Sequence, residues 1–202
     1  MKKTFALLIG LILLPLSVNA ADFKEGTHYD VISRTATETP EVLEFFSFYC
    51  PHCYKFEPLM NLLEKELPDN VRIKKNHVNF LGQNMGPKIT QAYAAAGILK
   101  VEDKITPIIF DEIHVQRKLI SSEQDILDIF AKAGVSEKEA ESALQSFPAN
   151  GIASQMRRNT EKYKIRGVPT LIINGKYKVN TGSVKSTDEF TALVEFLTKK
   201  TD

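Results

Sequence analysis

Both cysteines of the 202-residue chain lie in the stretch Val42-Leu43-Glu44-Phe45-Phe46-Ser47-Phe48-Tyr49-Cys50-Pro51-His52-Cys53. The apolar and aromatic residues at 42–49 predict a buried strand, and the residues that follow predict a helix. Two cysteines separated by two residues at a helix start lie one turn apart, close enough to bridge or to exchange with another disulfide. Backbone N–H groups at a helix N-terminus also favour a thiolate. The stretch therefore predicts a reactive dithiol where a strand leads into a helix.

The sequence after the cysteines completes a strand–helix–strand unit. Apolar residues recur with helical spacing and form one stripe: Phe56, Leu59, Met60, Leu63 and Leu67. Pro51 suits the first turn of this helix, where its missing N–H has no partner to lose. Residues 71–78 then predict a second strand, so this part of the chain forms a βαβ unit.

Residues 85–165 contain helix-start signals and no convincing strand. The segments Ser121-x-x-Gln124 and Ser136-x-x-Glu139 match the capping-box pattern, and Gly134 predicts a helix end between them. A block of short helices is therefore expected here.

Strand signals return after this block. Residues 170–173 and 177–179 flank Asn174-Gly175, which predicts a hairpin turn, and a helix is expected to begin at Ser186. The end of the chain is thus a ββα unit, and a short strand near 28–32 is expected to join the sheet.

Residues 1–20 have the pattern of an export signal. Two lysines precede an apolar run at 5–16, and small residues at 18 and 20 match a cleavage site before Ala21. A membrane anchor is the alternative, but the run is too short to span a bilayer comfortably. Without these residues the formal net charge is −1, since the whole chain is +1 and the signal carries two lysines. This near-neutral charge gives no reason to expect a nucleic-acid partner.

The order βαβ, helical block, ββα, with Cys-x-x-Cys opening the first helix, resembles the thioredoxin fold. The all-helical insertion resembles the DsbA family, the exported thiol oxidases of Gram-negative bacteria. The motifs that carry this resemblance are Phe45 to Tyr54, His77-Val78-Asn79-Phe80 and Arg166-Gly167-Val168-Pro169. The resemblance implies an α/β thioredoxin fold, in which 21–84 and 166–202 form the thioredoxin-like domain and 85–165 the helical insertion.

The two cysteines have different expected roles. Cys50 lies first, near the helix N-cap, where its sulfur is expected to be exposed and nucleophilic. Cys53 lies one turn further in and is expected to be buried and to resolve the mixed disulfide. An inert structural disulfide is the alternative, but a four-residue ring stabilises little on loop-closure grounds. The resemblance adds His52, which would donate a hydrogen bond or positive charge to the Cys50 thiolate, and Pro51 as part of the signature.

The resemblance also implies supporting residues. Pro169 would be the cis-proline that faces the sulfurs, and the backbone of Val168 would pair with an extended substrate. Glu44, Glu57 and Lys75 would form a charged group beneath Cys53 that helps to move a proton. From the residues alone, Glu44 is equally compatible with an exposed edge position, because a charge inside an apolar run is costly to bury.

The export signal and the resemblance together imply a periplasmic thiol:disulfide oxidoreductase. It would donate its Cys50–Cys53 disulfide to reduced exported proteins and be reoxidised by a DsbB-type membrane partner that passes electrons to quinone. No cofactor is expected, a monomer suffices, and His28, His77 and His114 are too scattered to predict a metal site. The alternatives are a disulfide isomerase or reductase, and a non-catalytic chaperone or binding module. Replacement of Cys50 by serine distinguishes these alternatives: loss of activity would support an enzyme, and full function would support a binding module.

Overall fold

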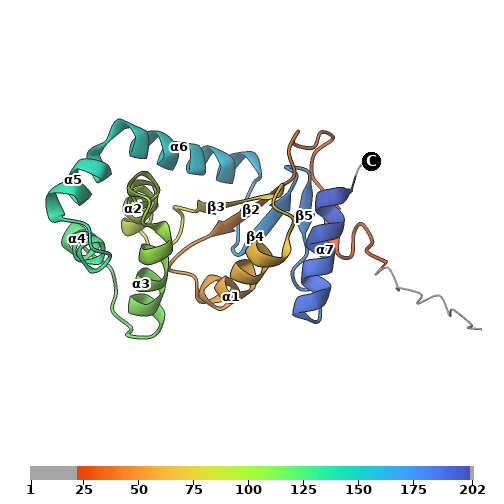
Figure 1. Cartoon of the computed structure of the whole chain (residues 1–202), viewed down its shortest axis with the longest axis horizontal. Helices are drawn as coiled ribbons and strands as arrows, with labels where there is room; N and C mark the ends of the chain where they lie inside the picture. Colours follow the sequence, from red (N-terminus) through yellow and green to blue (C-terminus); the bar gives the residue numbers. More distant parts are fainter. Residues whose placement is uncertain (1–21, 201–202) are drawn as a thin grey trace, which may run out of the picture.

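The computed structural model describes residues 22–200, and their elements form two groups (Figure 1). A five-stranded sheet with α1 and α7 forms one group, and helices α2 to α6 form the other beside it. The strands are β1 (Tyr29–Val31), β2 (Glu41–Phe46), β3 (Arg72–His77), β4 (Thr170–Ile173) and β5 (Tyr177–Val179). The helices are α1 (Pro51–Glu66), α2 (Met85–Leu99), α3 (Glu102–His114), α4 (Glu123–Lys132), α5 (Glu137–Gln145), α6 (Phe147–Lys162) and α7 (Thr187–Lys199).

The sheet has the order β1-β5-β4-β2-β3. β2 is parallel to β3 and antiparallel to β4, and all six of its residues are buried. Strand side chains alternate between the faces. Val42 packs with side chains of α1 and α7 on one face, whereas Leu43 and Phe45 pack on the other. Because Glu44 follows the same alternation as Val42, it points to the face that α1 covers.

The βαβ unit and the ββα unit are confirmed. The first helix begins at Pro51 directly after Cys50, and it continues through an internal proline. The short strand expected near 28–32 is β1, which pairs with β5 at the edge of the sheet. The Cys-x-x-Cys segment thus follows the end of β2, an interior strand, on the side where the sheet meets the helical group.

The hairpin between β4 and β5 turns at Asn174 and Gly175, whose φ angles are +53° and +64°. The Asn174 side chain accepts from the Glu41 N–H at 3.0 Å and donates to the carbonyls of Leu197 and Thr198 at 3.1 Å. This buried amide therefore fastens the hairpin to β2 and to the end of α7.

Helices α2 to α6, joined by loops, span the predicted helical block, and one capping position differs from the prediction. Ser122, not Ser121, is the N-cap of α4, and the N3 residue that completes the capping box is Asp125 instead of Gln124. The carboxylate of Asp125 accepts from the N–H groups of both serines at 3.0 Å, which a motif restricted to Glu or Gln overlooks. The box that begins at Ser136 is confirmed.

The predicted signal peptide, residues 1–20, lies outside the described residues. Within 22–200, no helix has the length and apolar character needed to cross a membrane.

Candidate active site

The Cys50 sulfur lies at the N-terminus of α1. Cys50 is the N-cap residue, with extended backbone (φ −96°, ψ 113°), and its Sγ accepts from the Cys53 N–H at 3.4 Å. The same Sγ donates to the Val168 carbonyl at 3.3 Å, and the Val168–Pro169 peptide bond is cis. Both cysteines are free thiols in this structure. The chain therefore brings the predicted Cys50, Cys53, Val168 and Pro169 together from segments more than a hundred residues apart.

The exposure predicted for the Cys50 sulfur is wrong, because Cys50 is only 6% exposed. Cys50 is covered by a tertiary contact, since its thiol donates a hydrogen bond to the Val168 carbonyl in the loop before β4. Cys53 is buried as expected, with 1% exposure. Burial raises the pKa of the Cys53 thiol, and the neighbouring Cys50 and Glu44 raise it further. The buried thiol therefore holds its proton tightly at neutral pH.

Glu44 is fully buried on β2, which lies between β3 and β4, so the edge position considered for it is wrong. It pairs with Lys75 across β2 and β3, and the Lys75 Nζ lies 3.5 Å from its Oε2, an ion pair slightly too long for a good hydrogen bond. Lys75 is also hydrogen-bonded to Glu57 of α1. Burial raises the pKa of Glu44 to about 7, against the opposing effect of Lys75, and Glu57 adds to the rise.

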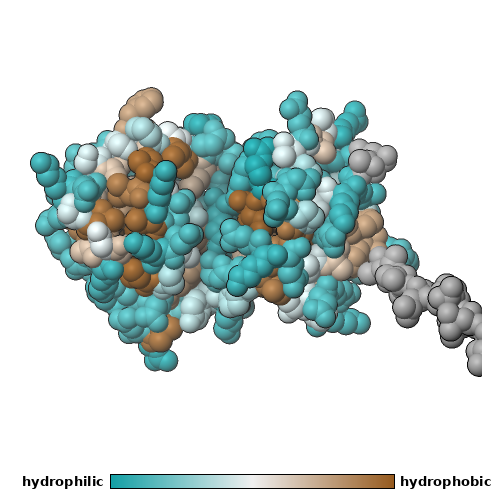
Figure 2. All heavy atoms as spheres, viewed as in Figure 1, coloured by the Kyte–Doolittle hydropathy of each residue, from teal (hydrophilic) through white to brown (hydrophobic). Residues whose placement is uncertain are grey.

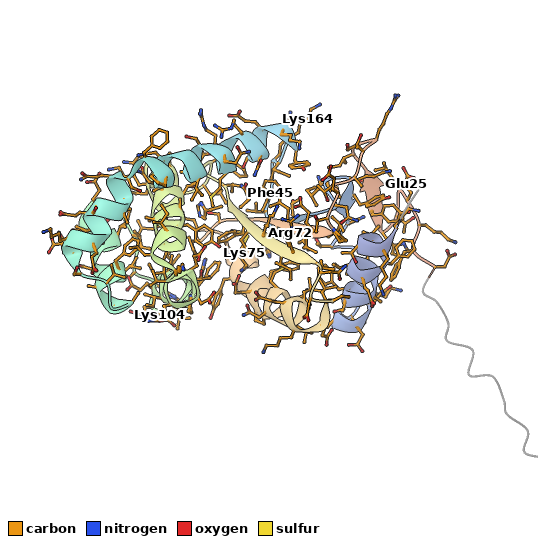
Figure 3. All side chains as sticks on the ribbon, turned by 45° about the horizontal axis from the view of Figure 1, so that its top comes forward. Glu25, Phe45, Arg72, Lys75, Lys104 and Lys164 are labelled. Carbon is orange, nitrogen blue, oxygen red and sulfur yellow. The ribbon has the colours of Figure 1, made fainter. Side chains whose placement is uncertain are left out.

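A groove of about 770 Å³ connects this charged group to the surface. Glu57 and Lys75 line it on the sheet side, and residues of α3 and α6 line it on the helical side, whereas Glu44 lies behind them. Lys75 lies nearer to the helical group than Arg72 does on the same strand (Figure 3). Lys75 and Glu57 are therefore the members of the charged group that line a groove reaching the surface.

The apolar residues on the face drawn in Figure 2 gather mainly over the helical group.

Two histidines, His77 and His114, bracket Phe48. The Phe48 N–H donates to His77 Nε2 at 3.1 Å, and the Phe48 carbonyl accepts from His114 Nε2 at 2.8 Å. Because burial lowers the pKa of His77 to about 3, its ring stays neutral and accepts at Nε2. Its Nδ1 therefore donates to Thr90 Oγ1, at 2.8 Å, and Thr90 donates onward to the Gly86 carbonyl. No local pattern signals these contacts.

Tyr49 is held by the insertion in a similar way. Its hydroxyl donates to the Ile120 carbonyl at 3.0 Å, and its ring lies over Gly82. A Cβ at Gly82 would lie 2.2 Å from the Tyr49 ring, so only glycine fits there. Phe48 and Tyr49, the two residues before Cys50, are thus positioned by the helical group and by the loop that leads into it.

His52 is exposed on the first turn of α1. Within residues 22–200 its ring makes no hydrogen bond to the Cys50 sulfur, so the hydrogen bond considered for it is not formed in this structure. Pro51 occupies the first helical position, as expected.

The geometry of the site is well suited to thiol–disulfide exchange. A sulfur at a helix N-terminus, a buried partner thiol one turn away and a cis-proline loop against the first sulfur can carry out thiol–disulfide exchange. On a mixed sheet entered by a βαβ unit and completed by a ββα unit, these features define a thioredoxin-fold thiol:disulfide oxidoreductase.

Comparison with known proteins defines the family. Residues 41–193 match the model of the DSBA-like thioredoxin domain. The thiol:disulfide interchange protein DsbA of Pectobacterium carotovorum is 39% identical, over 99% of this chain and 100% of that protein, and DsbA of Escherichia coli K12 is 36% identical with the same coverage. The crystal structure of DsbA from Proteus mirabilis superposes with a TM-score of 0.80 at 37% identity, covering 89% of this chain and 98% of the other. The chain belongs to the DSBA-like thioredoxin family and is a protein thiol:disulfide oxidoreductase. The predicted thioredoxin fold with a helical insertion is confirmed.

Proposed function

We propose that this protein is a periplasmic disulfide donor, whose oxidised Cys50–Cys53 pair passes its disulfide to reduced, newly exported proteins. The position of the Cys50 sulfur supports transfer of the disulfide from this protein to the substrate. Its Sγ accepts the Cys53 N–H at the start of α1, and the first turn of that helix contains no acidic residue. A negative sulfur is favoured at such a position, so the reduced form is stabilised and the disulfide is readily given away.

The exchange takes place in two steps that balance. A substrate thiolate attacks Cys50 Sγ, the Cys50–Cys53 bond breaks, and Cys53 leaves with the electron pair of that bond and takes up a proton. A second substrate thiolate then attacks the substrate sulfur of the mixed disulfide and expels the Cys50 thiolate. Two electrons move from the substrate to the enzyme, and the substrate gains one disulfide.

Glu44, Glu57 and Lys75 are proposed to supply and remove the Cys53 proton. Burial raises the pKa of Cys53, so its thiolate is a poor leaving group unless it takes up a proton. Glu44 has a pKa of about 7, which lets it give up or accept a proton near neutral pH. Lys75 contacts both carboxylates, and it lines the groove together with Glu57. Protons are thus passed between Cys53 and solvent through this group.

Substrate recognition is assigned to the backbone of Val168 next to Pro169, with His52 and Pro51 forming the first turn beside the attacked sulfur. Cys50 has no thiol proton in the disulfide or in the mixed disulfide, so in those forms the Val168 carbonyl lacks the bond that it accepts from the reduced thiol and is available to an extended chain. A relative supports a peptide substrate: the Proteus mirabilis DsbA was solved with a non-covalently bound peptide, and that structure superposes with a TM-score of 0.82 at 35% identity.

The remaining parts of the proposal follow the family. Residues 1–20 would be removed on export, residues 21–84 and 166–202 would form the thioredoxin-like domain, and residues 85–165 the insertion. A DsbB-type quinone reductase of the inner membrane would reoxidise the pair. The chain would act as a monomer without a bound cofactor.

The test is oxidation of a reduced, unfolded two-cysteine peptide by the oxidised mature protein. The wild type is expected to transfer one disulfide per molecule, and Cys50→Ser to transfer none. Cys53→Ser, once activated as a mixed disulfide at Cys50, is expected to hold a one-cysteine peptide in a stable covalent complex, because neither Cys53 nor a second peptide thiol is present to resolve it. Full oxidation by Cys50→Ser would contradict the mechanism, and protection of an unfolded protein from aggregation by that variant alone would favour a binding module.

A further inference from the structure

We propose that His114, from the helical insertion, is a positioning residue for Cys50. It fixes the central peptide of the turn that delivers Cys50 to the N-terminus of α1. This inference rests on the proposed function and names a residue that none of the site predictions includes.

The turn consists of Ser47, Phe48, Tyr49 and Cys50. The Cys50 N–H donates to the Ser47 carbonyl at 3.0 Å, which is the closing bond of a β-turn. In such a turn the peptide between the two central residues is the part that changes orientation most easily, since a flip of this peptide interconverts the common turn types. Here that peptide joins Phe48 to Tyr49, immediately before the attacked cysteine.

Both ends of this peptide are fixed by side chains. The Phe48 carbonyl accepts from His114 Nε2 at 2.8 Å, and the Tyr49 N–H donates to Ser47 Oγ at 3.2 Å. A carbonyl can only accept, so the Nε2 of His114 carries a proton in this contact. A flip of the peptide would break both bonds and would turn the carbonyl away from its only donor among the described residues.

The His114 ring is itself held in place. It lies in the last turn of α3, stacks on Tyr54 with centroids 5.2 Å apart and planes 12° from parallel, and contacts Phe110 at 5.9 Å. The preceding peptide is fixed independently by His77, which accepts the Phe48 N–H. The insertion therefore reaches the active-site turn through α3, while β3 and α2 hold it from the other side.

This support matters most when the disulfide is open. In the oxidised form, the bond to Cys53 holds the Cys50 sulfur at the helix N-terminus whatever the turn does. In the reduced form, the sulfur keeps its place through the turn and the bond that it accepts from the Cys53 N–H. Loss of the His114 bond is therefore expected to destabilise the reduced form more than the oxidised form.

The experiment measures the equilibrium in which the oxidised protein and two glutathione thiols give the reduced protein and one glutathione disulfide. His114→Leu keeps side-chain bulk but removes the donor, and its equilibrium constant is expected to shift three- to tenfold toward the oxidised protein. Tenfold corresponds to about 30 mV for this two-electron couple. His114→Gln retains an N–H donor of similar reach and is expected to stay within twofold of the wild type. His28→Leu, at a histidine far along the chain from the turn, is the matched control and is expected to leave the equilibrium unchanged.

Two results would overturn the inference: an unchanged equilibrium in His114→Leu, or equal shifts in the Leu and Gln variants. If His114→Leu does not fold, Ser47→Ala removes the bond at the other end of the same peptide and must shift the equilibrium in the same direction. The wild-type equilibrium alone tests the proposed disulfide donor. The differences between variants test His114, so the two can fail separately.

Discussion

Replacement of Glu44 by glutamine tests the electrostatics beneath Cys53. Glutamine keeps the size of the side chain and removes its charge. Burial raises the pKa of Glu44 from 4.5 to about 7, so the folded state binds this proton more tightly than the unfolded state. The resulting stabilisation is fully present below about pH 4.5 and is lost as the pH rises through about 7. At about 1.4 kcal/mol per pH unit, wild-type stability falls by about 3 kcal/mol across this window because of Glu44.

The Glu44→Gln variant lacks this loss. Its free energy of unfolding, relative to the wild type, is therefore expected to rise by about 3 kcal/mol between pH 4.5 and pH 8. Urea unfolding of the reduced proteins, followed by circular dichroism at several pH values, measures the difference. Glu41→Gln is the matched control, because Glu41 lies on the same strand but pairs with the half-exposed Lys74 at 2.7 Å. This control is expected to show no such gain at high pH.

A difference between Glu44→Gln and the wild type that stays constant across pH would contradict a raised pKa of Glu44 in the folded protein. It would mean that Glu44 titrates alike in the folded and unfolded chains, in which case it could not exchange a proton with Cys53 near neutral pH. The rate of peptide oxidation gives a second readout. Its pH dependence near 7 is expected to weaken in Glu44→Gln, because the buried carboxyl group is gone.

Three further predictions concern stability. Gly82→Ala is expected to lower the free energy of unfolding by about 3 kcal/mol, because its Cβ would overlap the Tyr49 ring. Gly134→Ala, with a similar φ of +86° but open space around the new Cβ, should lower it by about 1 kcal/mol. Equal melting temperatures of the two variants would contradict this prediction. Asn174→Ala removes three buried hydrogen bonds from a residue with φ +53° and is expected to cost about 3 kcal/mol in urea unfolding. Burial lowers the pKa of His77 to about 3, so its contribution to stability is present above pH 6.5 and is lost as the pH falls toward 3. His77→Gln should flatten acid unfolding over that range, and an unchanged acid profile would argue against a neutral buried ring.

The fold was predictable because its signals are local. Helical spacing after Cys53 predicted α1, and Asn174-Gly175 predicted the hairpin between β4 and β5. Each pattern is satisfied within about fifteen residues, so a single sequence contains the whole signal.

The position of Glu44 could not be predicted, because it depends on distant partners. The residues around Glu44 describe an apolar strand but not its neighbours in the sheet. Only pairing with β3 and β4 places the side chain in the centre and fully buried. The prediction that the Cys50 sulfur is exposed was wrong for the same reason, since its neighbour Val168 is 118 residues away in the sequence.

The two histidines around Phe48 were missed for a different reason. His114 ends a helix in the insertion, and its bond to the active-site turn depends on how α3 packs against residues 47–50. Periodicity predicts the face of a helix that is buried but not the carbonyl that it meets. The contacts that position Cys50 are therefore a product of tertiary packing.

We expect the reduced form of the Cys50–Cys53 pair to be more stable than the disulfide. The most direct measurement is the redox equilibrium of the mature protein with glutathione, combined with urea unfolding of both redox forms. We expect a reduction potential well above the value of about −270 mV for thioredoxin, with the reduced form more resistant to urea. A potential near that of thioredoxin, with the oxidised form more resistant to urea, would rule out a disulfide donor and identify the pair as a reductant or a structural disulfide.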